Sequence, residues 1–230
     1  LVAVTPRTMD SLVTVANHFV DTRMIAMEQR WGIHFNPDLR PQVAVEDPTS
    51  DGYLFTNGLA GMYQSQWLRV TLAWPDSDCV WPDTNVVDHE LVHVYCDHRS
   101  RSLGLPPWPN ATNTDTSSLA VQIAIRLQNE GMATSATERR ENLPGSRWRR
   151  YLPTEPSDCS AEHTPGRQFL YGGGRAMIQG IMDQVGLDAT VVYVVSHPVQ
   201  LQGRTFYKAL VHWVDQAKVD LHIKKGKKKK

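Results

Sequence analysis

The segment Asp88-His89-Glu90-Leu91-Val92-His93 constrains the local fold of this chain more than any other feature. Two histidines four residues apart share one face, one turn apart, when the segment is helical. A helix is therefore expected from about Asn85 to His98, with Thr84 or Asp83 capping its first amide groups. Apolar residues flank the two histidines and predict that this helix is buried: Val86, Val87, Leu91, Val92, Val94 and Tyr95.

Buried histidines and a buried glutamate need polar partners, and a metal ion is one such partner. Two imidazoles one turn apart can bind one zinc ion, and a glutamate between them can deprotonate a water molecule that the metal activates. We therefore expect His89 and His93 to be metal ligands and Glu90 to be the general base. The alternative is a surface helix with two solvated histidines, because a pattern of three fixed residues also arises by chance.

A catalytic zinc site needs a third protein ligand, and Glu130 is the candidate. A second helix is predicted from Asp115 or Thr116 to about Arg140, and Glu130 continues its apolar stripe. A carboxylate on a core-facing stripe is costly unless it is neutralised, and zinc would neutralise it. The alternative is an amphipathic helix whose stripe turns gradually toward solvent, so that Glu130 is exposed. The apolar members of the stripe are Leu119, Ile123 and Leu127.

Metal-bound imidazoles usually donate their second N–H to a carboxylate, hydroxyl or carbonyl group. Thr134 lies one turn beyond Glu130, and Asp97 lies one turn beyond His93, so both are candidates for this supporting role. Each could instead be a helix cap or a surface group. The expected cofactor is one zinc ion per chain.

The pair of segments His89-Glu90-Leu91-Val92-His93 and Asn129-Glu130-Gly131-Met132-Ala133 resembles the two motifs of the gluzincin zinc peptidases, His-Glu-x-x-His and Asn-Glu-Gly-x-Ala. This family includes the membrane-alanyl-type aminopeptidases and the smaller minigluzincins. The resemblance spans about residues 58–186 and implies a zincin-like metallopeptidase in which Glu130 is the third zinc ligand. The interval between the motifs is longer here, and the Pro- and Asn-rich segment Leu103–Asp115, a predicted loop, accounts for the excess.

The segment Gly61-Met62-Tyr63-Gln64 falls where the aminopeptidases carry Gly-x-Met-Glu-Asn before their edge strand. The glutamate of that pattern binds the free α-amine of the substrate, and it is missing here. An edge strand at Trp67–Trp74 could still hold peptide on both sides of the scissile bond. These features predict an endopeptidase, with Asp76 or Asp78 as the alternative source of an amine anchor.

A third segment, Tyr171-Gly172-Gly173-Gly174, resembles the Tyr-x-x-Gly at the start of a helix in several minigluzincins. The resemblance implies that Tyr171 stabilises the oxyanion during catalysis. His163 is a second candidate for this role, and an ordinary core position is the alternative for Tyr171.

The order of predicted elements indicates an α+β fold with an N-terminal helix, a small mixed sheet, the active-site helix and then helices only. We expect one catalytic domain over residues 1–222, with the sheet in about 1–100 and a helical part in about 115–222. The predicted strands are Val43–Val45 and Trp67–Trp74. The other predicted helices are Thr8–Trp31, ending at Gly32, Phe169–Val185, ending at Gly186, Ala189–Ser196 and Arg204–Val219.

Charge is distributed unevenly along the chain. Residues 223–230 form a lysine-rich tail with six lysines, and the remainder carries 18 basic and 24 acidic residues, a net charge of about −6. Such a tail is typically solvated and disordered, with binding to an acidic surface or an artificial addition as alternatives. An acidic body argues against a nucleic-acid partner.

No apolar run is long enough for a membrane span, and no feature indicates the oligomeric state.

Three cysteines do not make a disulfide framework. Cys96 is expected to be a buried thiol, whereas Cys79 and Cys159 lie in polar segments and could pair, which would imply an oxidising compartment. The chain shows no signal peptide and begins at Leu1, so we expect that its natural N-terminus was removed. A secreted or extracellular location is favoured over a cytoplasmic one.

These features together predict a zinc-dependent peptidase, a hydrolase acting on a peptide or protein substrate. Two alternatives stay open: a zinc-binding protein without catalysis, and a metallohydrolase that acts on something other than peptides. A structural zinc site would need no general base and would close its fourth position, so Glu90 favours catalysis.

Overall fold

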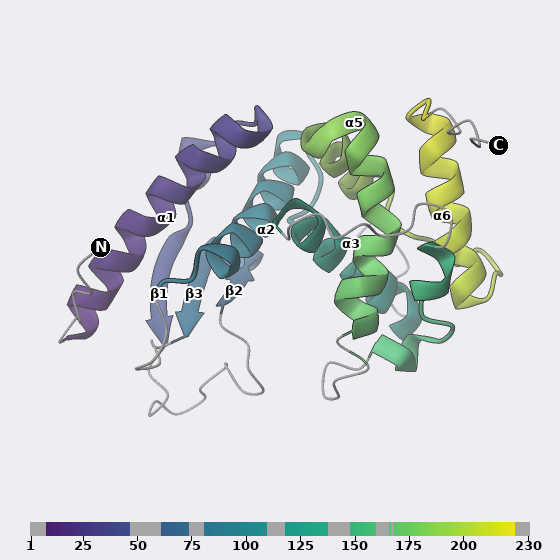
Figure 1. Cartoon of the computed structure of the whole chain (residues 1–230), viewed down its shortest axis with the longest axis horizontal. Helices are drawn as coiled ribbons and strands as arrows, with labels where there is room; N and C mark the ends of the chain where they lie inside the picture. The colour runs from purple at the N-terminus through teal and green to yellow at the C-terminus, as the bar shows by residue number, and fades with distance from the viewer. Residues whose placement is uncertain are drawn as a thin grey trace, which may run out of the picture.

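A computed structural model describes residues 8–46, 61–73, 81–109, 118–137, 148–159, 166 and 168–223. Within these ranges the chain forms five α-helices and a three-stranded sheet, which confirms the predicted α+β class. The helices are α1 (Met9–Trp31), α2 (Thr84–Ser102), α3 (Leu119–Thr137), α5 (Gly174–Ser196) and α6 (Phe206–Asp220). In Figure 1, α1 and the sheet lie at one end, α6 lies at the other, and α2 and α3 lie between them.

Helix α1 begins and ends where the sequence predicts. The Thr8 hydroxyl accepts a hydrogen bond from the Ser11 N–H at 3.2 Å and caps the first turn. Gly32 ends the helix with a φ of 62°, a left-handed conformation that glycine adopts without a steric penalty. The face of α1 that turns to the core carries Leu12, Ala16, Val20 and Met27.

The sheet is mixed and its strands run in the order β1-β3-β2. Strand β1 (Gln42–Glu46) pairs in parallel with β3 (Arg69–Ala73), with Val45 opposite Leu72. Strand β2 (Gly61–Gln64) pairs with β3 in the antiparallel sense. The small mixed sheet that the sequence predicts is therefore present, and β3 is its central strand.

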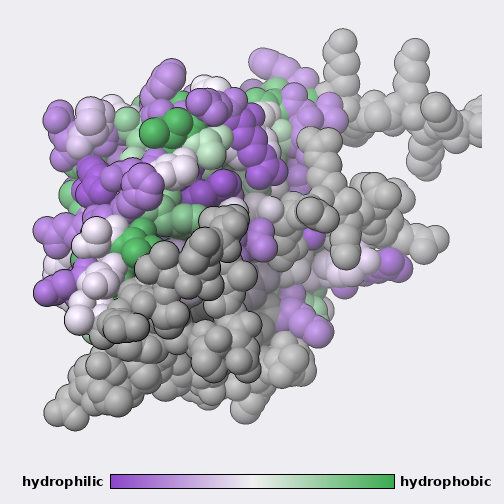
Figure 2. Space-filling model, turned by 60° about the vertical axis from the view of Figure 1, so that its left-hand side comes forward, coloured by the Kyte–Doolittle hydropathy of each residue, from purple (hydrophilic) through white to green (hydrophobic). Residues whose placement is uncertain are grey.

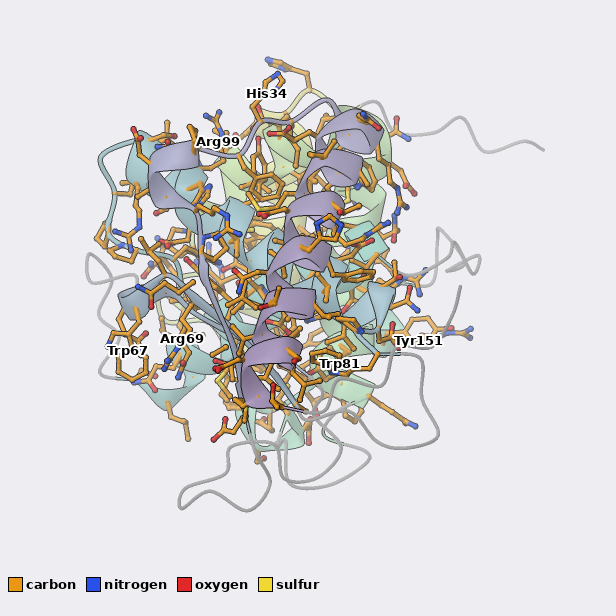
Figure 3. The ribbon with its side chains drawn as sticks, turned by 90° about the vertical axis from the view of Figure 1, so that its left-hand side faces the viewer. His34, Trp67, Arg69, Trp81, Arg99 and Tyr151 are labelled. Atoms are coloured by element: carbon orange, nitrogen blue, oxygen red, sulfur yellow. The ribbon has the colours of Figure 1, made fainter. Side chains whose placement is uncertain are left out.

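The predicted edge strand at Trp67–Trp74 is wrong in its extent and in its place. Trp67 belongs to a 3-10 turn, η2 (Ser65–Trp67), is 59% exposed, and lies at the periphery in Figure 3. Strand β3 begins only at Arg69 and is paired on both sides, so it has no free edge for a peptide. Trp74 lies outside the described residues. Strand β2 forms the edge of the sheet next to α2.

An ion pair joins the two helices that pack on the sheet. Helix α1 packs against β1 and α2 packs against β2. The Arg23 guanidinium on α1 donates from Nε and Nη2 to the two carboxylate oxygens of Asp88 on α2, each at 2.7 Å. A bidentate pair of this kind fixes geometry as well as adding energy. Since Asp88 is buried and precedes His89, the pair holds the start of the metal motif against α1.

The α1 side of the molecule carries mainly hydrophilic side chains where the described residues are visible, with apolar residues in separate groups (Figure 2). Exposed apolar residues are scattered over the fold, as at Ile25 on α1 and Leu119 on α3. Among the helices that the structure describes, none combines the length and apolar character that a bilayer span requires.

Two glycines let the helices of the second half approach each other closely. A Cβ placed on Gly131 of α3 would overlap the backbone of Gly174, the first residue of α5, and would lie 2.9 Å from its Cα. Glycine at position 131 therefore allows α3 and α5 to pack this closely. Further along α5, Gly186 has a φ of 83° and interrupts the helix, at the predicted boundary between two helical segments.

The structure leaves the predicted disulfide without support. Cys159 is a free, buried thiol, and burial raises its pKa to about 12. Cys79 lies outside the described residues, so an oxidising compartment stays a prediction. Cys96 is a buried thiol, as expected.

His98 lies inside α2, which continues to Ser102, and not at the helix end, where the predicted range of about Asn85 to His98 placed it. Its Nε2–H donates to the Leu39 carbonyl at 2.8 Å, and its Nδ1 accepts from the Asn36 N–H at 3.3 Å. The backbone N–H can only donate, so this ring is neutral in the folded protein. Burial lowers the pKa of His98.

Replacing His98 with glutamine should remove one pH-dependent part of the stability. Because the pKa of His98 is lower in the folded protein than in the unfolded chain, its contribution is complete above about pH 6.5 and declines as the pH falls. Urea unfolding at several pH values between about 7.5 and 5 should show the gap in unfolding free energy between wild type and His98→Gln shrinking at low pH. A gap that stays constant would contradict a neutral His98.

Candidate metal centre

Three predicted ligands from two helices meet where α2 crosses α3. Nε2 of His89 lies 3.1 Å from Oε2 of Glu130, and Nε2 of His93 lies 3.7 Å from the same oxygen. One ligand atom from each residue lies within 4.8 Å of the other two. Ligand atoms around a tetrahedral zinc, at about 2.0–2.1 Å from it, are about 3.4 Å apart. The group can therefore hold a metal ion with small adjustments.

A cap at the start of α2 fixes where this helix begins and therefore where its two histidines lie. Asp83 caps the helix, accepting from the Asn85 N–H at 2.7 Å, so the predicted Asp83 is the cap. The His89 and His93 rings lie edge to face, with centroids 4.8 Å apart. The His89 side chain is 20% exposed and the Glu130 side chain 14%, so the group lies at the surface of the core and not deep inside it.

The electrostatics of Glu130 suit a cation. Burial alone would raise the pKa of Glu130, but hydrogen bonds and favourable charge interactions with His89 and His93 lower it well below its ordinary value. The carboxylate is therefore ionised. Two imidazoles and one ionised carboxylate are the donor set of many catalytic zinc sites, and they leave one position open.

Glu90 lies beside the ligands on α2 and is 6% exposed. Burial raises the pKa of Glu90 to about 7, with a further contribution from the charge of Glu130, while His89 and the Tyr63 backbone N–H act in the opposite sense. A carboxylate with a pKa near 7 is well matched to proton transfer at neutral pH. A metal cation bound nearby would favour the ionised form.

Strand β2 borders this site because of a glycine. A Cβ on Gly61 would lie 2.7 Å from Cγ1 of Val86 and 3.1 Å from Cγ of Glu90, so only glycine lets the strand approach α2 this closely. The Tyr63 backbone N–H of the same strand bonds the Glu90 carboxylate. Among the described strands, only β3 pairs with β2, so the other edge of β2 is not used by them.

Tyr171 lies near the candidate metal ligands, and its role at the oxyanion stays a prediction. It belongs to a π-helical turn, η5 (Phe169–Gly173), and its ring centroid is 6.0 Å from that of His89. The turn leads directly into Gly174, whose close approach to Gly131 ties it to α3. His163, the second candidate for this role, lies outside the described residues.

The residue that supports His93 is Asn129, and neither predicted residue does so. Oδ1 of Asn129 lies 3.1 Å from Nδ1 of His93, and both side chains are buried. Thr134 is buried, but its hydroxyl has no hydrogen-bond partner among the described groups. Asn129 precedes Glu130 in the second motif, and this adjacency is the signal in the sequence that would have identified it.

Asp97 points away from the imidazoles because α2 turns it toward β2 and the segment after the helix. Its Oδ2 accepts from the Tyr63 hydroxyl at 2.7 Å and from Nε of Arg101 at 3.0 Å. Its Oδ1 accepts from the Trp108 backbone N–H at 3.0 Å. The prediction that Asp97 directly supports a metal-bound imidazole is therefore wrong.

Comparisons of the chain with protein-family models, with curated proteins and with solved structures find no match. The resemblance to the gluzincins thus rests on the two motifs alone. The observation independent of that resemblance is geometric: His89 and His93 of α2 and Glu130 of α3 form a group that can hold a metal ion.

Proposed function

We propose that this chain is a zinc-dependent peptidase of zincin-like fold that cleaves within peptide chains. The observation that carries the proposal is the meeting of His89, His93 and Glu130 with Glu90 buried beside them. Two imidazoles and a carboxylate suit zinc, and an adjacent glutamate is the general base that zinc hydrolysis requires.

Bound zinc would polarise the scissile carbonyl and lower the pKa of water to about 7. Glu90 takes a proton from the attacking water and passes it to the leaving amine. Tyr171, whose ring centroid is 6.0 Å from that of His89, is the proposed donor, through its hydroxyl, to the oxyanion that develops on the substrate. His89 and His93 would hold the metal from one helix, and Glu130 would hold it from the next.

Glu90 favours catalysis over a purely structural role for the metal. A buried carboxylate with a raised pKa costs stability, and such groups cluster at active sites because catalysis uses them. A structural zinc site gains nothing from a carboxylate in this position. The partial exposure of His89 and Glu130 also fits a site that admits a substrate.

Strand β2 favours a peptide as the substrate. An extended peptide can add to the edge of β2 that the described strands leave unpaired, and Glu90 lies against the same strand. At the position of the missing amine anchor, the Tyr63 side chain points to Asp97 and offers no carboxylate. A peptide on this edge can therefore continue on both sides of the scissile bond, which supports endopeptidase action.

Acetylating the N-terminus of a good peptide substrate should leave its cleavage rate nearly unchanged. A charged hydrogen bond to a free amine contributes about 1.5–3 kcal/mol, so an enzyme that used one would lose about 10- to 100-fold in rate on acetylation. The measurement compares one peptide with a free and an acetylated N-terminus and identifies the products by mass spectrometry. Blocked cleavage, with residues lost one at a time from the free peptide, would show an aminopeptidase instead.

A further inference from the structure

The segment between α2 and α3 folds back onto α2 and buries Trp108. The Leu105 N–H donates to the Ser100 carbonyl at 3.0 Å, and the Ser100 hydroxyl donates to the Pro106 carbonyl at 2.6 Å. The Trp108 N–H donates to Asp97, which is fully buried. Trp108 is 2% exposed and is thereby held between the two helices that supply the metal ligands.

The indole of Trp108 contacts the amide that supports His93. Its Nε1–H donates to Oδ1 of Asn129 at 3.0 Å, and the same oxygen lies 3.1 Å from Nδ1 of His93. An indole N–H can only donate, so the Asn129 atom between them must be the carbonyl oxygen and not the amide nitrogen. The Trp108 contact therefore fixes the orientation of the Asn129 amide, which the His93 contact alone would leave open.

The orientation of Asn129 decides which nitrogen of His93 carries the proton. A carbonyl oxygen can only accept, so Nδ1 of His93 must be the donor. A neutral imidazole has one N–H, and Nε2 therefore keeps its lone pair. That nitrogen is the one that faces Glu130, at 3.7 Å. The tautomer enforced by Asn129 is thus the tautomer that can bind a metal through Nε2.

We propose that Trp108 is a positioning residue of the metal centre, which fixes the Asn129 amide and through it the metal-binding tautomer of His93. Without the indole N–H, the amide can turn over and present its NH₂ group to Nδ1. Nδ1 would then accept, and the proton would lie on Nε2, where it must be displaced before a metal binds. The two tautomers have the same charge, so the effect is one of orientation.

This assignment also gives Asp97 an indirect role in the site, through Trp108 and Asn129. Asp97 holds the Trp108 backbone, the Trp108 indole holds Asn129, and Asn129 holds His93. Outer partners of metal-bound histidines commonly change metal affinity by about 10- to 100-fold when they are replaced. The inference rests on the proposed metal site but not on peptide hydrolysis.

The test is Trp108→Phe, which keeps an aromatic ring and removes the donor. Competition with a zinc chelator should show an affinity about 10- to 100-fold weaker than that of wild type. Trp213→Phe is the matched control, because it also removes a buried indole N–H, which donates to the His197 carbonyl at the C-terminal end of α5. The control should lose comparable stability and keep the wild-type zinc affinity.

The nitrogen chemical shifts of His93 give a second readout that needs no zinc. In zinc-free wild-type protein, at a pH high enough to leave one proton on the ring, nitrogen-15 NMR should find that proton on Nδ1 of His93, and in Trp108→Phe it should shift toward Nε2. A wild-type proton on Nε2 would overturn the proposal, as would equal zinc affinities in Trp108→Phe and Trp213→Phe. A protein with Trp108-dependent zinc binding but no peptidase activity would refute the proposed function and leave this inference standing.

Discussion

Glu90→Gln protein is expected to bind zinc like wild type and to hydrolyse peptides about 10²- to 10⁴-fold more slowly. The amide keeps the shape of the side chain but cannot accept the proton of the attacking water. Because burial raises the pKa of Glu90, its ionised form is costly in the fold, and the neutral amide should not destabilise the protein. Zinc content, thermal stability and kcat/KM are measured on the same preparation.

An exposed glutamate supplies the control for this experiment. Glu155→Gln makes the same chemical change at an exposed position and should leave activity unchanged. Activity of Glu90→Gln within a few-fold of that of the control would remove Glu90 from the role of general base.

Gly131→Ala should produce the second large effect. A methyl group at this position overlaps the backbone of Gly174, which cannot move aside as a flexible side chain could, so α3 and α5 must separate. Overpacking costs about 1–3 kcal/mol, and contact with backbone places this case at the upper end. Glu130 directly precedes Gly131, and Tyr171 lies one turn before Gly174. A shift of such groups by about 1 Å can cost about 10²-fold in rate. Denaturant unfolding and kcat/KM measure the two effects.

Gly180→Ala is the matched control on the same pair of helices. A Cβ at Gly180 of α5 would have no atom within 4 Å, and the residue is exposed. Exchanging a helical glycine for alanine there should stabilise by about 0.5–1 kcal/mol and leave activity unchanged. Equal behaviour of the two variants would show that the Gly131–Gly174 contact does not position the site.

Local patterns in the sequence were sufficient to predict the three candidate metal ligands. Helical spacing alone places His89 and His93 on one face. Glu130 was identified as the continuation of an apolar stripe on a second helix, of which Leu127 is buried but Leu119 is 67% exposed, so the stripe faces the core only toward its end. The ends of α1 were also readable, because Thr8 and Gly32 act within one turn of the helix. Each of these predictions depends on residues that are close together in the chain.

The place of each strand in the sheet could not be predicted in the same way. The β-branched and aromatic residues before Pro75 mark a strand that is well buried, and that is why β3 lies in the centre. The edge strand β2 is short and contains a glycine, so its composition is a weak strand signal. Strand order depends on pairing between distant segments, to which local composition gives no guide.

The polar partners of the site were missed for a related reason. The helix from Asn85 was predicted to end at about His98, but α2 continues to Ser102 and the segment around Leu39 covers the ring of His98. Trp108 lies in an irregular stretch with no periodicity, 21 residues before Asn129, and only the packing of α2 against α3 brings the two together. Side-chain hydrogen bonds between distant residues leave no repeat in the sequence.

A zinc titration is the most direct test of the zinc-peptidase account. Zinc is removed from the purified protein with a chelator, and hydrolysis of an internally cleaved peptide is followed as zinc is returned in steps. The account predicts no hydrolysis without zinc and a rise that levels off at about one zinc per chain, with no comparable recovery in Glu130→Ala. Hydrolysis that persists without zinc, or recovery in Glu130→Ala equal to that of wild type, would contradict it.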